Sequence, residues 1–168
     1  MKTRLGVLFF IVSAALGPAS GSELSDYLSE GTLKEVVTLT EAQEGFVGVA
    51  GMSWVVEPSG AWRISNFVNQ QVQEPKERGQ LNKEQMAVVA GLLASEKYSD
   101  LPPRFGRDVQ VNRHLLSISF GQMTKTLILN PGEAADVKAV DTLAPSRVGA
   151  ARNFLRIFEG IKNLLQKN

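Results

Sequence analysis

The chain has 168 residues, of which 43% are apolar and 21% charged, a composition typical of a folded domain. It has no cysteine, which excludes disulfides, thiolate metal sites, a cysteine nucleophile and a bacterial lipoprotein anchor. Its single histidine also excludes any site that needs two imidazoles, and a formal net charge of +1 provides no general attraction for nucleic acid.

The N-terminus has the pattern of a cleaved secretory signal peptide over residues 1–21. Lys2 and Arg4 give a positive start, residues 5–16 are apolar with small interruptions, and small residues follow. We expect cleavage after Ala19 or Gly21. A retained membrane anchor is the weaker alternative, because a membrane-spanning helix needs about 20 apolar residues.

Removal of this segment changes the charge of the protein. Two of the 18 basic residues lie in it and no acidic ones do, so the mature chain has 16 basic against 17 acidic residues, a net charge of −1. No second apolar run is long enough to span a membrane. We therefore expect a periplasmic or extracellular protein that does not bind nucleic acid and is held together by its core alone.

Residues 33–168 are predicted to form one domain, preceded by a flexible lead-in at 22–32 with one helical turn near Leu24. Period-two alternation of apolar and polar residues predicts three consecutive strands. These strands are expected at 33–40, 47–57 and 61–68, with turns at 41–45 and at Pro58-Ser59-Gly60. Short connections between successive strands indicate an antiparallel meander.

The next segment, 69–79, has almost no apolar residue and is predicted to be a solvated loop. Asn82 and Gln85 have the spacing of a capping box, so a helix is expected to begin there and to end before Leu101-Pro102-Pro103. The alternation then returns and predicts a hairpin of two strands, at 115–120 and 126–129, with a turn at 121–124.

Residues 148–165 form the clearest helical pattern, with apolar side chains over about half of the circumference. Such a face needs to be buried, most simply against a sheet; docking into a groove or onto a membrane surface is the alternative. The predicted fold class is α+β, in the order β-β-β-α-β-β-α, with both helices on one face of an antiparallel sheet.

Residues for catalysis or for cofactor binding do not stand out. His114 lies at a predicted strand entrance without a G-x-S-x-G motif, and the aspartates are scattered without metal-ligand spacing. A carboxylate pair could act without histidine, but nothing marks one pair over another. We predict a protein that is not an enzyme, with no catalytic residue, metal or cofactor.

Two segments are candidates for contact with a protein partner. Gly45, Phe46, Val47 and Gly48 form a glycine-framed turn, and this turn lacks the lysine and the following helix of a phosphate loop. The second segment contains Arg104, Phe105, Arg107 and Arg113. Arginine and aromatic residues are favoured anchors in interfaces, although a solvated connection is the alternative. Trp54 and Trp62 are interpreted as core residues, with exposed binding residues as the alternative.

Two stretches carry a family resemblance. Val36–Trp54 reads VVTLTEAQEGFVGVAGMSW, and Leu81–Pro102 reads LNKEQMAVVAGLLASEKYSDLP. A strand, a Gly-Gly-Phe-Ala-Gly-like turn, a second strand and a helix ending near Leu-Pro resemble the emfourin-like proteins of bacteria, and the similarity covers most of the mature chain. The turn here reads Glu44-Gly45-Phe46-Val47-Gly48, so Glu44 replaces the first glycine.

The resemblance implies an inhibitor of thermolysin-like metalloproteases that occupies the cleft of the enzyme, so a secreted metalloprotease is the expected partner. It assigns no contact residues, and our own candidates remain Phe46 and its neighbours. The alternatives are a non-inhibitory binding module or assembly subunit of the cell envelope, using the Arg104–Arg113 segment, and an enzyme that would depend on a carboxylate pair.

Overall fold

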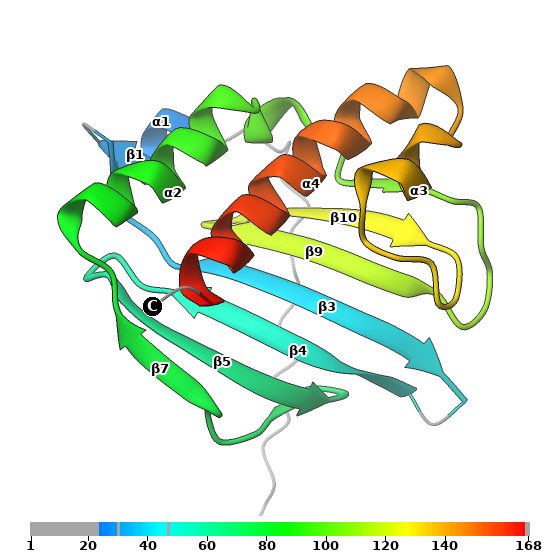
Figure 1. Cartoon of the computed structure of the whole chain (residues 1–168), viewed down its shortest axis with the longest axis horizontal. Helices are drawn as coiled ribbons and strands as arrows, with labels where there is room; N and C mark the ends of the chain where they lie inside the picture. The colour runs from blue at the N-terminus through cyan, green and yellow to red at the C-terminus, as the bar shows by residue number, and fades with distance from the viewer. Residues whose placement is uncertain (1–23, 30, 47, 167–168) are drawn as a thin grey trace, which may run out of the picture.

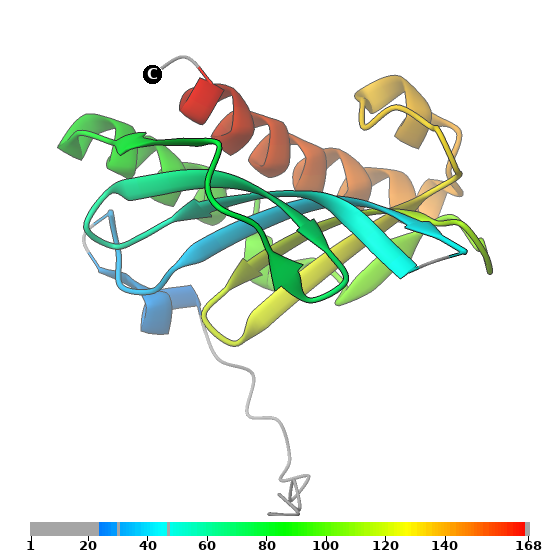
Figure 2. The same cartoon turned by 90° about the horizontal axis from the view of Figure 1, so that it is seen from below.

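The computed structural model describes residues 24–166, except 30 and 47. The predicted signal segment lies outside the described residues. The described chain forms two layers, a large sheet with helices on one of its faces (Figures 1 and 2). This confirms a mixed α+β protein with a mostly antiparallel sheet. None of the helices in the described part is long and apolar enough to cross a membrane.

The predicted meander is present as β3 (Val37–Gly45), β4 (Gly48–Val56) and β5 (Ala61–Val68). The turn predicted at 41–45 is wrong, because these residues continue β3 and pair with β4 as far as Gly45 opposite Gly48. Glu41, Gln43 and Glu44 broke the apolar alternation, but backbone pairing does not require apolar side chains. The actual turn is therefore only two residues long.

The later hairpin joins the sheet on the other side of β3. It consists of β9 (His114–Phe120) and β10 (Met123–Leu129), so the turn predicted at 121–124 is shorter than expected. β9 pairs antiparallel with β3, with Val37 opposite Phe120 and Gln43 opposite His114. The sheet order is β6-β5-β4-β3-β9-β10-β8, which places β3 in the centre.

Three short edge strands were not predicted. β6 (Gln71–Val72) and β7 (Glu77–Gln80) both pair with β5, so the segment 69–79 is not simply a loop. β8 (Arg104–Gly106) pairs with β10 and is the one parallel strand among those described. All four residues of β7 are exposed, so the sequence carries no alternation that could reveal the strand.

The segment predicted as a lead-in contains the expected helical turn, α1 (Leu24–Tyr27). It also contains β1 (Leu28–Ser29) and β2 (Thr32–Leu33), which pair with each other. The ring of Tyr27 lies 5.6 Å from that of Phe120, and Leu33 is buried. These contacts attach the segment to one end of the sheet.

The two main helices are α2 (Lys83–Ser95) and α4 (Pro145–Gln166), and both lie on the same face of the sheet, as predicted (Figure 1). The capping box of α2 is formed: Asn82 Oδ1 accepts from the Gln85 amide and Gln85 Oε1 from the Asn82 amide, each at 2.9 Å. Two shorter elements complete the layer, the 3-10 turn η1 (Tyr98–Asp100) and α3 (Val137–Asp141).

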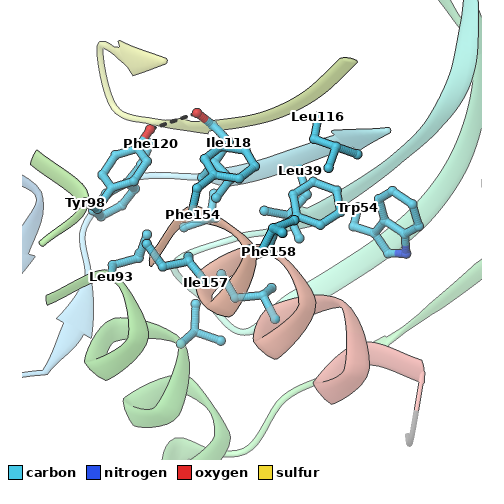
Figure 3. Close-up of a cluster of buried hydrophobic side chains, with 14 of the residues drawn as sticks. Leu39, Trp54, Leu93, Tyr98, Leu116, Ile118, Phe120, Phe154, Ile157 and Phe158 are labelled. Carbon is cyan, nitrogen blue, oxygen red and sulfur yellow. Dashed lines mark hydrogen bonds between the residues drawn. The ribbon is translucent and has the colours of Figure 1, made fainter. Parts of the chain in front are cut away.

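Aromatic side chains form the centre of the core between α4 and the sheet (Figure 3). Phe158 stacks on Phe154, with ring centroids 5.9 Å apart, and meets Trp54 edge-on at 6.1 Å. Trp54 and Trp62 are both buried, which confirms their interpretation as core residues. The broad apolar face of α4 is therefore buried against the sheet, rather than in a groove or on a membrane surface.

Tyr98 connects η1 to the β9–β10 hairpin. Its buried hydroxyl lies 2.8 Å from the Ile118 carbonyl oxygen (Figure 3). It also lies 3.0 Å from the Met123 carbonyl oxygen. We expect Tyr98→Phe to lower the free energy of unfolding by about 1–2 kcal/mol, because the buried carbonyls lose their donor while the ring still fills its place. Urea denaturation monitored by tryptophan fluorescence measures this loss. An unchanged midpoint would show that the hydroxyl does not stabilise the fold.

Candidate functional site

Three segments meet at one end of the sheet, and we call this region the loop end. It consists of residues 44–49 at the β3–β4 turn, residues 68–72 from the end of β5 through β6, and residues 107–113 before β9 (Figure 1). Seven large apolar side chains are exposed among the described residues, and four of them lie here: Phe46, Val68, Val72 and Val111. Exposed apolar side chains gathered at one place are typical of a contact surface.

Phe46 stands at the tip of the β3–β4 hairpin and is fully exposed. Gly48 has φ = 120°, and a Cβ atom there would lie 2.0 Å from Asn69 Oδ1. Asn69 Oδ1 accepts from the Val49 amide at 3.0 Å, and the Asn69 amide donates back to the Val49 carbonyl. The absence of a side chain at Gly48 therefore leaves room for Asn69, which binds the β3–β4 hairpin next to its tip. Val47, the fourth residue of this predicted contact, lies outside the described residues.

An ion pair fixes the other side of the same tip. Arg113 Nε and Nη2 donate to the two carboxylate oxygens of Glu44 at 2.6 and 2.5 Å. The Glu44 amide also donates to the Arg113 carbonyl at 2.8 Å, and Gln43 Nε2 donates to the Asn112 carbonyl. Arg113 lowers the pKa of Glu44, so the pair stays charged at neutral pH. Glu44, the residue that departs from the glycine-rich turn pattern, thus attaches the tip to the 107–113 segment.

A shallow, open hollow of about 610 Å³ lies between the tip and this segment. It is lined by Glu44, Gly45, Phe46, Gly48, Val49, Gln110, Val111 and Asn112. The structure therefore unites part of both predicted contact segments, which lie more than 60 residues apart in the sequence. The hollow is open on one side, which suits a protein surface more than a small molecule.

The structure does not support Phe105 and Arg107 as exposed anchors. Phe105 is 8% exposed and its ring meets Phe154 edge-on in the core. Arg107 pairs with Glu133 at 2.6 Å and donates to the Ala139 carbonyl at 3.0 Å. Phe105 faces the core because β8 joins the sheet, and Arg107 holds α3 in place. Arg104 is exposed, but it lies on β8, outside the loop end.

A polar cluster that the sequence did not reveal lies next to the loop end, between β3, β9 and α4. His114 Nδ1 lies 2.8 Å from the Glu133 carbonyl oxygen, and its Nε2 lies 3.3 Å from Glu41 Oε1. Lys162 Nζ donates to Glu41 Oε2 at 3.0 Å and lies 5.3 Å from the centre of the Trp54 ring. No spacing signal could have revealed this cluster, because α4 and β3 are far apart in the sequence.

Both ring nitrogens of His114 face acceptors, so both need a proton. The hydrogen bond with Glu41, supported by Glu133, raises the pKa of His114 despite its partial burial. The hydrogen bonds from His114 and Lys162 hold the pKa of Glu41 at about 2, against the effect of burial. In this arrangement the His114 ring joins β9, β3 and the turn at Glu133. The described residues include no group of three His, Asp or Glu side chains that could hold a metal ion.

The chain matches no model of a known protein family and no curated protein. The resemblance carried by the turn at Glu44–Gly48 and by α2 therefore stays a prediction. Geometry and residue chemistry at the loop end are the basis for assigning a function.

The polar cluster makes stability depend on pH. The pKa of His114 is raised in the folded state, so its protonated form stabilises the fold. This stabilisation is fully present below pH 6.5, the ordinary pKa of histidine, and is lost as the pH rises through the raised pKa. The pKa of Glu41 is lowered from 4.5 to about 2, so the stabilisation from its ionised form is fully present above pH 4.5. The cluster therefore stabilises the fold most between pH 4.5 and 6.5.

We expect the wild type to lose stability as the pH rises above 6.5 and through the raised pKa of His114, and His114→Gln to lose less over the same interval. The glutamine can keep a hydrogen bond but does not titrate. Urea unfolding at several pH values measures both dependences. Parallel curves for the two proteins would show that His114 does not carry this effect.

Proposed function

We propose that the protein is an exported, non-catalytic protein-binding domain that inhibits a thermolysin-like metalloprotease by placing its loop end in the cleft of the enzyme. The observation that carries the proposal is Phe46, a fully exposed aromatic side chain on a hairpin tip that is fixed on both sides. Exposure of so large an apolar side chain is unfavourable in water, and a binding role explains it.

The way in which the tip is held supports a role in binding. Immobilising a loop when a complex forms costs free energy, and a loop that is already fixed avoids much of that cost. Asn69 holds one strand of the hairpin, and Arg113 holds the other through Glu44. Phe46 is thus presented on a prearranged support, as expected of a residue that contributes strongly to affinity.

The same contacts favour a protease as the partner. Proteolysis depends on local opening of the chain. Opening of this tip would break the Glu44–Arg113 ion pair and both hydrogen bonds between Val49 and Asn69, one to the Asn69 side chain and one from its backbone amide. An inhibitor that enters an active-site cleft needs this resistance. The metalloprotease class comes from the resemblance of the turn to the emfourin-like proteins.

Phe46→Ala should weaken inhibition of a thermolysin-like protease at least about tenfold, because an aromatic anchor typically contributes more than about 1.4 kcal/mol to binding. Val88→Ala is the matched control, since Val88 is also exposed but lies on α2, away from the loop end. The inhibition constant is measured by titrating enzyme activity with each variant. An inactive wild type, or equal inhibition by wild type and Phe46→Ala, would contradict the proposal.

Export can be tested separately. A bacterial host with a secretory pathway should release a shortened chain that begins at Ser20 or Ser22, the residues that follow the two expected cleavage sites. Intact-mass and N-terminal analysis of the periplasmic and medium fractions identifies the product. An intact chain beginning at Met1 that is retained in the cytoplasm would contradict export.

The exposed Val111 supports a second candidate, a non-inhibitory binding module of the cell envelope. This side chain is 68% exposed and lies beside the tip rather than on it, so it suits a broad, flat partner. Such a module would lose its partner on Val111→Asp and would inhibit no protease. Quantitative pull-down from an envelope extract, comparing that variant with wild type, distinguishes the two functions.

A further inference from the structure

A hollow of about 310 Å³ lies on the face of the sheet opposite the main helices, and we call it the sheet hollow. Its floor consists of Thr38 and Thr40 on β3 and of Ser53 and Val55 on β4. Thr38 and Thr40 flank the core residue Leu39 along β3, so their side chains face away from α4. Figure 2 shows α2, α3 and α4 together on the other side of the sheet.

The hairpin between β5 and β6 forms one wall of the sheet hollow. Asn69, Gln70 and Val72 line it together with Phe67, the residue opposite Val72. Asn69 has a left-handed backbone conformation (φ = 55°), which asparagine adopts more readily than most residues. Two hydrogen bonds between Asn69 and Val49 hold this turn against β4. The wall is therefore fixed before a ligand binds, which lowers the free-energy cost of binding.

The lining combines an apolar patch with hydroxyl groups that are available to a ligand. Val55, Phe67 and Val72 supply the apolar surface, and Val72 is 65% exposed. Thr38 and Thr40 are half-buried, and their hydroxyls make no hydrogen bond to another described residue. Mostly apolar hollows of about 300 Å³ or more, with a few polar groups of this kind, are typical of sites for small molecules.

Arg63 is the one charged residue among the described residues that line the sheet hollow. Its side chain is 43% exposed, and its Nη1 donates to Glu57 Oε1 at 2.6 Å. A guanidinium has five N–H donors in a planar fork, so Nε and Nη2 of Arg63 remain for a second carboxylate. The lining contains no acidic residue, and a charged group bound there is therefore expected to be negative.

We infer that the sheet hollow binds a small organic carboxylate with a short apolar chain. The chain lies on Val55, Phe67 and Val72, and burial of this apolar surface supplies most of the affinity. The carboxylate accepts hydrogen bonds from Arg63, which sets the class of ligand. This site goes beyond the proposed function, because Phe46 does not line the sheet hollow.

Other ligand classes match the lining less well. Recognition of a polyanion depends on several basic residues, and Arg63 is the only basic residue in the lining. An amine would meet the positive charge of Arg63 without an acidic residue beside it in the hollow. An alcohol could pair with the threonine hydroxyls but would gain nothing from the charge of Arg63.

Titration of the protein with hexanoate, followed by amide chemical shifts in NMR spectra, tests this inference. We expect saturable shifts at residues 38–40 and 69–72, with a dissociation constant of about 1 mM or lower. 1-Hexanol has the same chain without the charge and should bind about threefold more weakly. The difference is modest because Arg63 is partly exposed, where a charge contributes little. Hexylamine should give no saturable shifts.

Two variants separate the carboxylate from the chain. Arg63→Gln should remove the preference for hexanoate and leave the binding of 1-hexanol unchanged. Val55→Phe should abolish binding of both, because the larger side chain fills the hollow from its floor. Val88→Phe is the matched control, since Val88 is exposed on α2, on the other side of the sheet. Circular dichroism shows whether Val55→Phe is folded, and Val72→Asp, on the exposed wall, replaces it if it is not.

Hexanoate that gives no saturable shifts up to about 10 mM, or shifts at other residues only, overturns the inference. Equal affinity for hexanoate and 1-hexanol overturns the assignment of a carboxylate, and undiminished binding to folded Val55→Phe overturns the site. Phe46→Ala should leave the dissociation constant of hexanoate unchanged. Failure of this site and failure of protease inhibition are therefore separate results.

Discussion

The register of β3 between β4 and β9 determines most of what this protein presents to its surroundings. β3 pairs along its whole length with β4, and along seven residues with β9, so its side chains cannot shift independently of either neighbour. A slip by one residue would move Leu39 to the face of the sheet opposite α4 and Thr38 into the core. The aromatic side chains of α4 favour the observed register, because Phe158 packs edge-on against Trp54, the residue opposite Leu39.

The same register forms the loop end. It brings Gln43 opposite His114, and the next residues, Glu44 and Arg113, then meet just beyond the last paired residues. The polar cluster of Glu41, His114 and Lys162 lies immediately behind this point and joins α4 to the sheet. Ion pairs and hydrogen bonds thus fix the backbone on either side of the exposed tip. They explain how a short turn can present an aromatic side chain to water without apolar packing around it.

The candidate site could be predicted only in part. The glycines around Phe46 mark an exposed turn locally, because glycine permits backbone conformations that other residues avoid. An aromatic residue between arginines suggested an exposed anchor at Phe105. Its side chain instead packs against Phe154, because β8 joins the sheet, and no local pattern reveals that pairing. Arg107 was misjudged for a related reason: its partner Glu133 belongs to a segment whose position depends on the whole sheet.

The sequence by itself determined the local elements: the meander, the capped helix α2, the hairpin and the amphipathic α4. Periodicity and capping are properties of neighbouring residues, so they can be read without knowing the fold. Only the tertiary structure decided that β9 adds beside β3, that β7 and β8 complete the edges, and that Glu41, His114 and Lys162 meet. Such pairings join residues that are distant in the chain, and their free energy comes from packing and backbone hydrogen bonds that no local pattern encodes.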